Sequence, residues 1–88
     1  MISNVLPAKN ESAALGALLP RLRQAQPQAE IIVVDDGSTD DTAAVCEVHG
    51  VRVLRSPYSL GNGAAIKRGA RAASGDILVF MDSDGQND

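Results

Sequence analysis

Strand-like apolar runs alternate with helix-like segments along the whole of this 88-residue chain. The run at 30–36, EIIVVDD, is continuously apolar before its acids, which is typical of a parallel strand covered on both faces. Further strand-like runs lie at 2–8, 51–55 and 76–82. The order β-α-β-α-β-α-β predicts an α/β fold with a parallel sheet and right-handed crossovers, as one domain or one half of a domain.

The first intervening segment carries the clearest helix signal. Leucines recur over residues 11–24 with the spacing of an amphipathic helix. Pro20 lies inside this pattern, and a proline has no N–H for the helical ladder. We therefore expect a kink or a restart of the helix at Pro20.

The later helices are predicted from their ends. Ser38 and Asp41 have the spacing of a capping box, which predicts a helix start after Gly37. Gly50 is expected to end that helix. An alanine-rich segment at 64–73 predicts the last helix, which we expect Gly75 to end.

Charge and cysteine content exclude several classes of protein. The net charge of −3 argues against a nucleic-acid-binding protein, because such a protein would present a basic face. The single cysteine, Cys46, excludes an internal disulfide and is expected to be a buried core residue. The chain has no signal-peptide pattern and no apolar run near the ~20 residues that a membrane helix needs. We expect a cytoplasmic protein.

Polar residues follow three of the predicted strands. PAKNE follows the first, VDDGS closes the second and MDSDGQ closes the fourth. Since the carboxyl ends of parallel strands share one rim, where ligands bind in open α/β sheets, these segments are expected to form one site.

The second of these segments offers hydrogen-bond acceptors at the rim. Asp35 and Asp36 end an apolar strand, and a carboxylate there could accept a nucleobase N–H or a ribose hydroxyl. Gly37 permits a tight turn after them. For Asp40 and Asp41, the charge preference of a helix N-terminus is a sufficient explanation.

The segment LGNGAAIKRG matches neither the dinucleotide fingerprint nor a Walker loop. Gly61 and Gly63 open a helix whose N-terminal N–H groups could face a phosphate. Lys67 and Arg68 follow in its first turns, although a surface helix with solvated cations explains them as well.

The closing DSD is the strongest chemical signal in the chain. Asp82 and Asp84 can face one site once the strand ends, and carboxylates with substrate phosphates are the ligands that Mg²⁺ or Mn²⁺ prefers. An acid-rich surface turn is the alternative.

Taken together, VLPAKNE, EIIVVDDGSTDDT, GNGAAIKRGARAASGD and ILVFMDSDGQND resemble, in this order, the family 2 inverting glycosyltransferases of GT-A type. The closing DSDGQND is most similar to the polyprenyl-phosphate sugar transferases, such as dolichyl-phosphate mannose synthase. The resemblance implies that residues 1–88 are a Rossmann-like, donor-binding N-terminal half of a GT-A domain. The acceptor half would follow it.

The resemblance also implies roles for particular side chains. Asp36 would hydrogen-bond the base, and Asp82 and Asp84 would bind the metal with the diphosphate. The nucleotide-sugar contacts it implies, together with those expected from the rim, are Pro7, Ala8, Asn10, Glu11, Asp35, Asp36, Gly37, Lys67, Arg68, Asp82, Ser83 and Gln86.

The implied activity is metal-dependent transfer of sugar from a GDP- or UDP-sugar to an acceptor, a polyprenyl phosphate, with inversion. We expect the 88 residues alone to bind nucleotide without transferring sugar, and the full-length protein to work at the inner face of the membrane. A non-catalytic nucleotide-binding or regulatory module is the alternative. The open edge of a truncated sheet is expected to favour homo-oligomers.

Overall fold

The computed structural model describes residues 1–81. Its sheet has the strand order β3-β2-β1-β4, and every neighbouring pair is parallel. The predicted alternation of strands and helices is confirmed. The elements are β1 (Ile2–Ala8), α1 (Ser12–Ala25), β2 (Glu30–Asp36), α2 (Thr42–Val48), β3 (Arg52–Ser56), α3 (Asn62–Ala72) and β4 (Ile77–Phe80).

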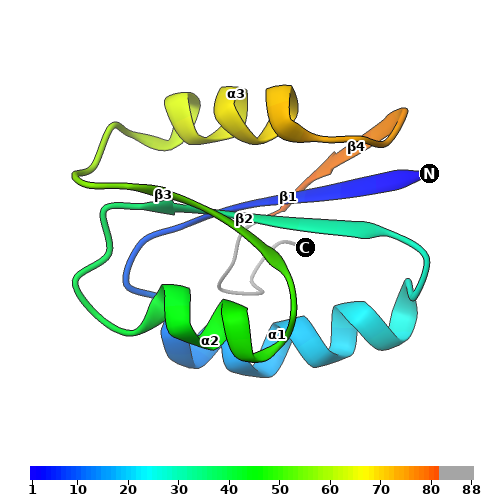
Figure 1. Ribbon diagram of the computed structural model, residues 1–88, viewed down its shortest axis with the longest axis horizontal. Helices are drawn as coiled ribbons and strands as arrows, with labels where there is room; N and C mark the ends of the chain where they lie inside the picture. The colour runs from blue at the N-terminus through cyan, green and yellow to red at the C-terminus, as the bar shows by residue number, and fades with distance from the viewer. Residues whose placement is uncertain (82–88) are drawn as a thin grey trace.

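Helices cover both faces of the sheet. Figure 1 shows α3 on one face and α1 with α2 on the other. The strand β2 is apolar throughout because alternate side chains enter opposite cores. Ile31 and Val33 pack in the cluster that contains α1, whereas Ile32 and Val34 pack in the cluster that contains Ala65 of α3.

The helix α1 runs through Pro20 as one helix, so the restart considered above does not occur. Its buried leucines, Leu15, Leu19 and Leu22, lie on both sides of the proline and hold the two halves against the same core. Pro20 itself is exposed. Packing of the apolar stripe therefore outweighs the missing backbone hydrogen bond.

The capping-box prediction for α2 was also wrong. The helix begins after Asp41, which makes no side-chain capping bond, and the Ser38 hydroxyl instead accepts the backbone N–H of Asn10. The Asp40 carboxylate accepts the N–H of Thr42 at 2.9 Å and performs the capping from a different position. Gly50, with a φ of 68°, does end this helix region as predicted.

The helix α3 ends earlier than the sequence suggested. Its last residue is Ala72, and Ala73 is already extended, so Gly75 does not end it. Gly75 instead contacts the start of β1. Its N–H donates to the Ser3 hydroxyl at 2.8 Å, and a Cβ at this position would lie 2.5 Å from the Met1 carbonyl oxygen. This glycine lets the chain pass closely over the start of β1.

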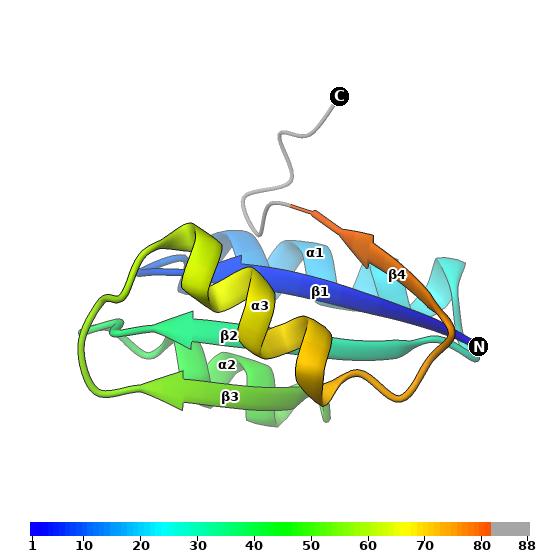
Figure 2. The same ribbon diagram turned by 90° about the horizontal axis from the view of Figure 1, so that it is seen from above.

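The strand β4 lies at one edge of the sheet. Seen from above in Figure 2, α3 crosses β1 and β2 and leaves β4 uncovered. Ile77, Leu78 and Phe80 are correspondingly 56%, 38% and 45% exposed. Within residues 1–81, no helix is both long and apolar enough to cross a bilayer.

Candidate functional site

The loops that follow β1, β2 and β3 meet at one rim of the sheet. Figure 2 shows the three arrowheads pointing to the same side, where these loops gather. The parallel registers of β1 with β2 and of β2 with β3 bring the strands' carboxyl ends together. The predicted convergence of PAKNE and VDDGS is therefore confirmed.

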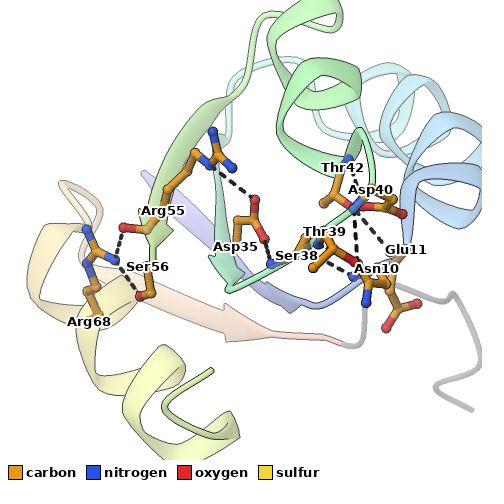
Figure 3. A network of polar contacts seen from close by, with 10 residues as sticks. All are labelled: Asn10, Glu11, Asp35, Ser38, Thr39, Asp40, Thr42, Arg55, Ser56 and Arg68. Carbon is orange, nitrogen blue, oxygen red and sulfur yellow. Dashed lines mark hydrogen bonds and ion pairs between the residues drawn. The ribbon is translucent and has the colours of Figure 1, made fainter. Parts of the chain in front are cut away.

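Asn10 joins the first loop to the second, as Figure 3 shows. Its side-chain oxygen accepts the backbone N–H of Thr39 at 2.8 Å and that of Asp40 at 3.2 Å. The backbone N–H of Asn10 donates to the Ser38 hydroxyl at 2.9 Å. Asn10 adopts a φ of 54°, a left-handed conformation that asparagine tolerates better than most residues. Its amide oxygen is thus engaged within the protein.

The same two loops are joined again one residue further on. The backbone N–H of Glu11 donates to the Thr42 hydroxyl at 3.0 Å, and that of Ser12 reaches the Asp40 carboxylate at 3.4 Å. The Asp40 carboxylate also accepts from the Thr42 hydroxyl, which lowers the pKa of Asp40. Sequence reasoning missed Thr42, whose side chain is fully buried here.

Asp35 is buried beneath Arg55. One carboxylate oxygen accepts the backbone N–H of Ser38 at 3.0 Å, and this hydrogen bond closes a tight turn of the chain. The other has no hydrogen-bond donor in the described part of the chain and lies 3.5 Å from the Arg55 Nε, in an ion pair (Figure 3). A pocket of about 320 Å³ lies beside this pair, lined by Ser38, Arg55, Ser56 and Pro57. Only 1% of the surface of Asp35 is exposed, so its carboxylate is engaged within the protein and is not open to a ligand.

Asp36 points to the opposite face of the sheet and binds the loop before α3. Its carboxylate accepts the N–H of Leu60 at 2.8 Å, the N–H of Gly61 at 3.0 Å and the hydroxyl of Ser59 at 2.9 Å. The hydrogen bond from Leu60 is the main cause that lowers the pKa of Asp36. The sequence had suggested a ligand-binding role, and nothing local pointed to Ser59 or Leu60.

Lys67 and Arg68 lie on α3 in different environments. The Arg68 guanidinium donates to the Arg55 carbonyl at 2.7 Å and to the Ser56 hydroxyl at 2.9 Å, and it ties α3 to the end of β3 (Figure 3). Lys67 is exposed and stands about 200° around the helix from the buried Ala65. The structure therefore separates these two predicted contacts.

The remaining predicted residues divide into two groups. At the end of β1, Pro7 is half-buried and Ala8 is buried, at the centre of the rim. Four predicted contacts fall outside the described residues: Asp82, Ser83, Asp84 and Gln86. Among residues 1–81, no three potential metal-ligating side chains come together, so the predicted metal site depends on the segment after β4.

Comparison with known proteins identifies the family. The family model described as "Glycosyl transferase family 2" matches residues 3–88. This chain belongs to glycosyltransferase family 2. The resemblance of the four sequence motifs to that family is confirmed.

Two curated relatives extend the comparison. The chain is 40% identical to glucosyl-3-phosphoglycerate synthase of Mycobacterium tuberculosis, over 94% of the chain and 28% of the relative. It is 38% identical to 4,4'-diaponeurosporenoate glycosyltransferase of Staphylococcus haemolyticus, over 94% of the chain and 24% of the relative. The chain thus spans about a quarter of the length of these curated relatives.

A solved structure confirms the fold class. The crystal structure of the Mycobacterium tuberculosis glucosyl-3-phosphoglycerate synthase in complex with Mn²⁺, uridine diphosphate and glucosyl-3-phosphoglycerate superposes with a TM-score of 0.82. The two chains are 39% identical, over 94% of this chain and 33% of that one. The family 2 chain described here thus has the sheet architecture of a GT-A glycosyltransferase.

Proposed function

We propose that residues 1–88 form the nucleotide-sugar-binding part of an enzyme that transfers a sugar with inversion. One observation carries the proposal: a solved relative 39% identical to this chain holds Mn²⁺ and uridine diphosphate. The rim supports it, because the loops after three strands meet at the place where open parallel sheets bind ligands.

The proposed roles follow the geometry where it is described. Pro7, Ala8 and Glu11 would border the nucleotide at the end of β1, and Lys67 would offer a positive charge from α3. Asp82 and Asp84 would hold a divalent cation, since carboxylates suit Mg²⁺ and Mn²⁺, and Ser83 and Gln86 would lie beside the sugar diphosphate. That cation would neutralise the charge on the departing nucleoside diphosphate.

The closing motif and the comparisons favour different acceptors. A polyprenyl phosphate, and with it work at a membrane surface, rests on the likeness of DSDGQND to one subgroup of the family. The relative named for glucosyl-3-phosphoglycerate instead supports a small phosphorylated acceptor. Both acceptors carry a phosphate group, but a polyprenyl phosphate would attack through a phosphate oxygen, whereas a phosphoglycerate also offers a hydroxyl group, which would need a general base.

Calorimetric titration of the purified chain tests the donor part. UDP and GDP are each titrated with Mn²⁺, with Mg²⁺ and with EDTA, into the natural chain and into Asp82→Asn and Asp84→Asn. Glu47→Gln, an exposed carboxylate on α2, is the matched control for loss of one charge.

We expect metal-dependent binding of one diphosphate that both aspartate variants lose and the control keeps. Equal binding in EDTA would contradict the metal's role. Absence of binding by a folded chain would contradict the proposed donor site. Binding without any transferase activity in the full-length protein would favour the alternative of a non-catalytic nucleotide-binding module.

A further inference from the structure

We propose that Ser3 and Glu30, here called the β4 clamp, fix the register in which β4 pairs with β1. Through that register they act as positioning residues for the segment that follows Met81. The clamp lies at the amino ends of β1 and β2, at the opposite end of the sheet from the rim. The part of this inference that concerns cation and diphosphate binding rests on the proposed function, whereas the register does not.

The side chains of β4 do little to select a register. The strand has four residues, ILVF, and in the described part of the chain it pairs with β1 alone. A buried face normally fixes the register of a strand, because a slip by one residue would turn its apolar side chains outward. Three of the four side chains of β4 are exposed, and Val79 is half-buried. The register is therefore specified largely by contacts outside the strand.

The clamp binds two consecutive backbone N–H groups in the connection before β4. The Ser3 hydroxyl donates to Glu30 Oε1 at 2.8 Å and accepts the N–H of Gly75 at 2.8 Å. The same Glu30 oxygen accepts the N–H of Ser74, also at 2.8 Å. Ser3 and Glu30 are register partners on β1 and β2, so their side chains share one face of the sheet. Figure 2 shows this connection passing the start of β1 before β4 begins.

Gly75 adds a steric selection to these hydrogen bonds. A Cβ on Gly75 would lie 2.5 Å from the Met1 carbonyl oxygen and 2.6 Å from the Ser3 hydroxyl oxygen. A slip of β4 by one residue would bring Ser74 or Asp76 to this place, and each of these residues carries a Cβ. Only the observed register therefore places the residue that has no side chain against β1.

Arg52 connects the clamp to β3 and to the end of α3. Its guanidinium lies 3.7 Å from Glu30 Oε2 and donates to the Ala72 carbonyl oxygen at 2.8 Å. These contacts orient the Glu30 carboxylate, so that its other oxygen faces Ser3 and Ser74. The clamp is thus supported by the three strands that precede β4.

The register decides where the chain arrives at the rim. Consecutive strand residues advance about 3.3 Å and point to opposite faces, so a slip by one residue would displace and reverse the side chains. In the observed register the N–H of Met81 donates to the Val5 carbonyl oxygen at 3.2 Å. Asp82 and Asp84, the proposed cation ligands, follow directly in the sequence. Because a binding constellation tolerates errors of only about 0.5 Å, a slipped β4 would disable that site.

The first measurement observes the register directly. Cross-strand NOEs between β1 and β4 are recorded by NMR in the nucleotide-free, 88-residue chain. Hydrogen exchange is followed at the Ile77 and Met81 amides, which donate to the Met1 and Val5 carbonyl oxygens of the neighbouring chain segment. Amides in the centre of β2 report whether each variant is folded.

Three substitutions remove the proposed contacts: Ser3→Ala, Glu30→Ala and Gly75→Ala. Glu30→Gln tests rescue, since it keeps a side-chain oxygen that can accept both hydrogen bonds. Gly16→Ala is the matched glycine control, because a Cβ there would meet only Val45, at an ordinary 3.9 Å.

The second measurement is calorimetric titration of UDP and of GDP in the presence of Mn²⁺, into the same variants. Val51→Ala serves as the control for general loss of stability. Val51 is buried beside β3, at the opposite edge of the sheet from β4, so its truncation removes core volume without touching the clamp.

We expect the Ile77 and Met81 amides to exchange at least about tenfold faster in the three clamp substitutions, with the centre of β2 unchanged. The NOEs of the observed register should weaken or be replaced by those of another register. Glu30→Gln and Gly16→Ala should stay close to the natural chain. Binding of the preferred diphosphate with Mn²⁺ should weaken at least about tenfold in the three clamp substitutions and by no more than about twofold in Val51→Ala.

Natural NOEs and natural exchange in folded Ser3→Ala and Gly75→Ala would overturn the clamp. A changed register with undiminished binding in Mn²⁺ would overturn the positioning role, and so would an equal loss of binding in Val51→Ala. If the natural chain binds neither diphosphate, the proposed function and the binding part of this inference fail, while the NMR comparison still decides whether the clamp sets the register.

Discussion

The Asn10 side-chain oxygen accepts the backbone N–H of Thr39 at 2.8 Å, across 29 positions of sequence. The same oxygen accepts the N–H of Asp40, and the Asn10 N–H donates to Ser38 in return. The loops after β1 and β2 therefore form one connected unit, and a change at either end should be felt at the other.

Replacing Asn10 should destabilise the protein by two separable causes. Asn10→Ala removes the acceptor for two backbone donors and puts alanine at a φ of 54°. We expect the free energy of unfolding to fall by about 2–3 kcal/mol, measured by urea unfolding. Asn10→Gly should recover about 1 kcal/mol of this, because it relieves only the backbone strain. Equal stability of Asn10→Ala and the natural chain would show that the hydrogen bonds of Asn10 do not contribute to the free energy of unfolding.

Two of the glycines with positive φ, Gly37 and Gly50, allow backbone strain to be separated from steric contact. A Cβ at Gly37 would collide with the backbone of Tyr58 and Ser59, whereas a Cβ at Gly50 would meet no atom within 4 Å. Gly50→Ala should cost about 1 kcal/mol of stability, the strain alone, and Gly37→Ala should cost at least 1 kcal/mol more. Thermal unfolding of the two variants side by side makes the comparison, and equal losses would argue against close packing at Gly37.

The Cys46 thiol should be unreactive in the folded protein. Cys46 is fully buried, and this burial, assisted by the negative charges of Asp35 and Glu47, raises the pKa of the thiol to about 11. At pH 8 only about one thiol in a thousand is then ionised. Labelling with a disulfide reagent should proceed only as the chain unfolds, at a rate that follows urea concentration. Rapid labelling in buffer would mean that α2 opens locally.

Acid should weaken the protein through Asp36 and Glu30. The hydrogen bond from Leu60 lowers the pKa of Asp36, and the one from Ser74 lowers the pKa of Glu30. Because both values are lower in the folded state than in the unfolded state, the stabilisation is fully present above about pH 5 and is lost as the pH falls through the folded values.

Urea unfolding measured from about pH 6 to pH 2.5 should therefore show stability declining below about pH 4, with a shallower decline in Asp36→Asn. The control is Asp41→Asn, since Asp41 is exposed at the start of α2 and makes no side-chain capping bond. Identical pH profiles for the natural chain and Asp36→Asn would contradict this assignment.

The exposed edge of β4 should promote association of the 88-residue chain. No strand of residues 1–81 pairs with its outer side, and Ile77, Leu78 and Phe80 are all more than a third exposed. Light scattering should show mass rising with concentration, and Leu78→Lys should suppress the rise, because a charge on an edge strand disfavours pairing. Val48→Lys, at an exposed position on α2, is the control. A monomer at all concentrations would refute the expectation.

Sequence patterns predicted the architecture because they reflect contacts repeated along each element. The apolar run of β2 requires covering on both faces, and it received α1 on one and α3 on the other. The boundaries were less predictable where long-range packing competes with local rules. Pro20 sits inside a continuous helix, and Gly75 approaches β1 without ending α3.

The sequence by itself determined the order of elements, the shared rim and the family, since periodicity and short motifs are properties of neighbouring residues. The tertiary structure alone decided what the acids at the end of β2 bind. Asp35 and Asp36 are adjacent in sequence, yet the pleat of the strand turns them to opposite faces, so that one lies under Arg55 and the other holds the loop before α3. The groups that donate hydrogen bonds to Asp36 lie 23 to 25 positions further along the chain. The fold brings them to Asp36, and no periodic pattern in the sequence indicates this contact.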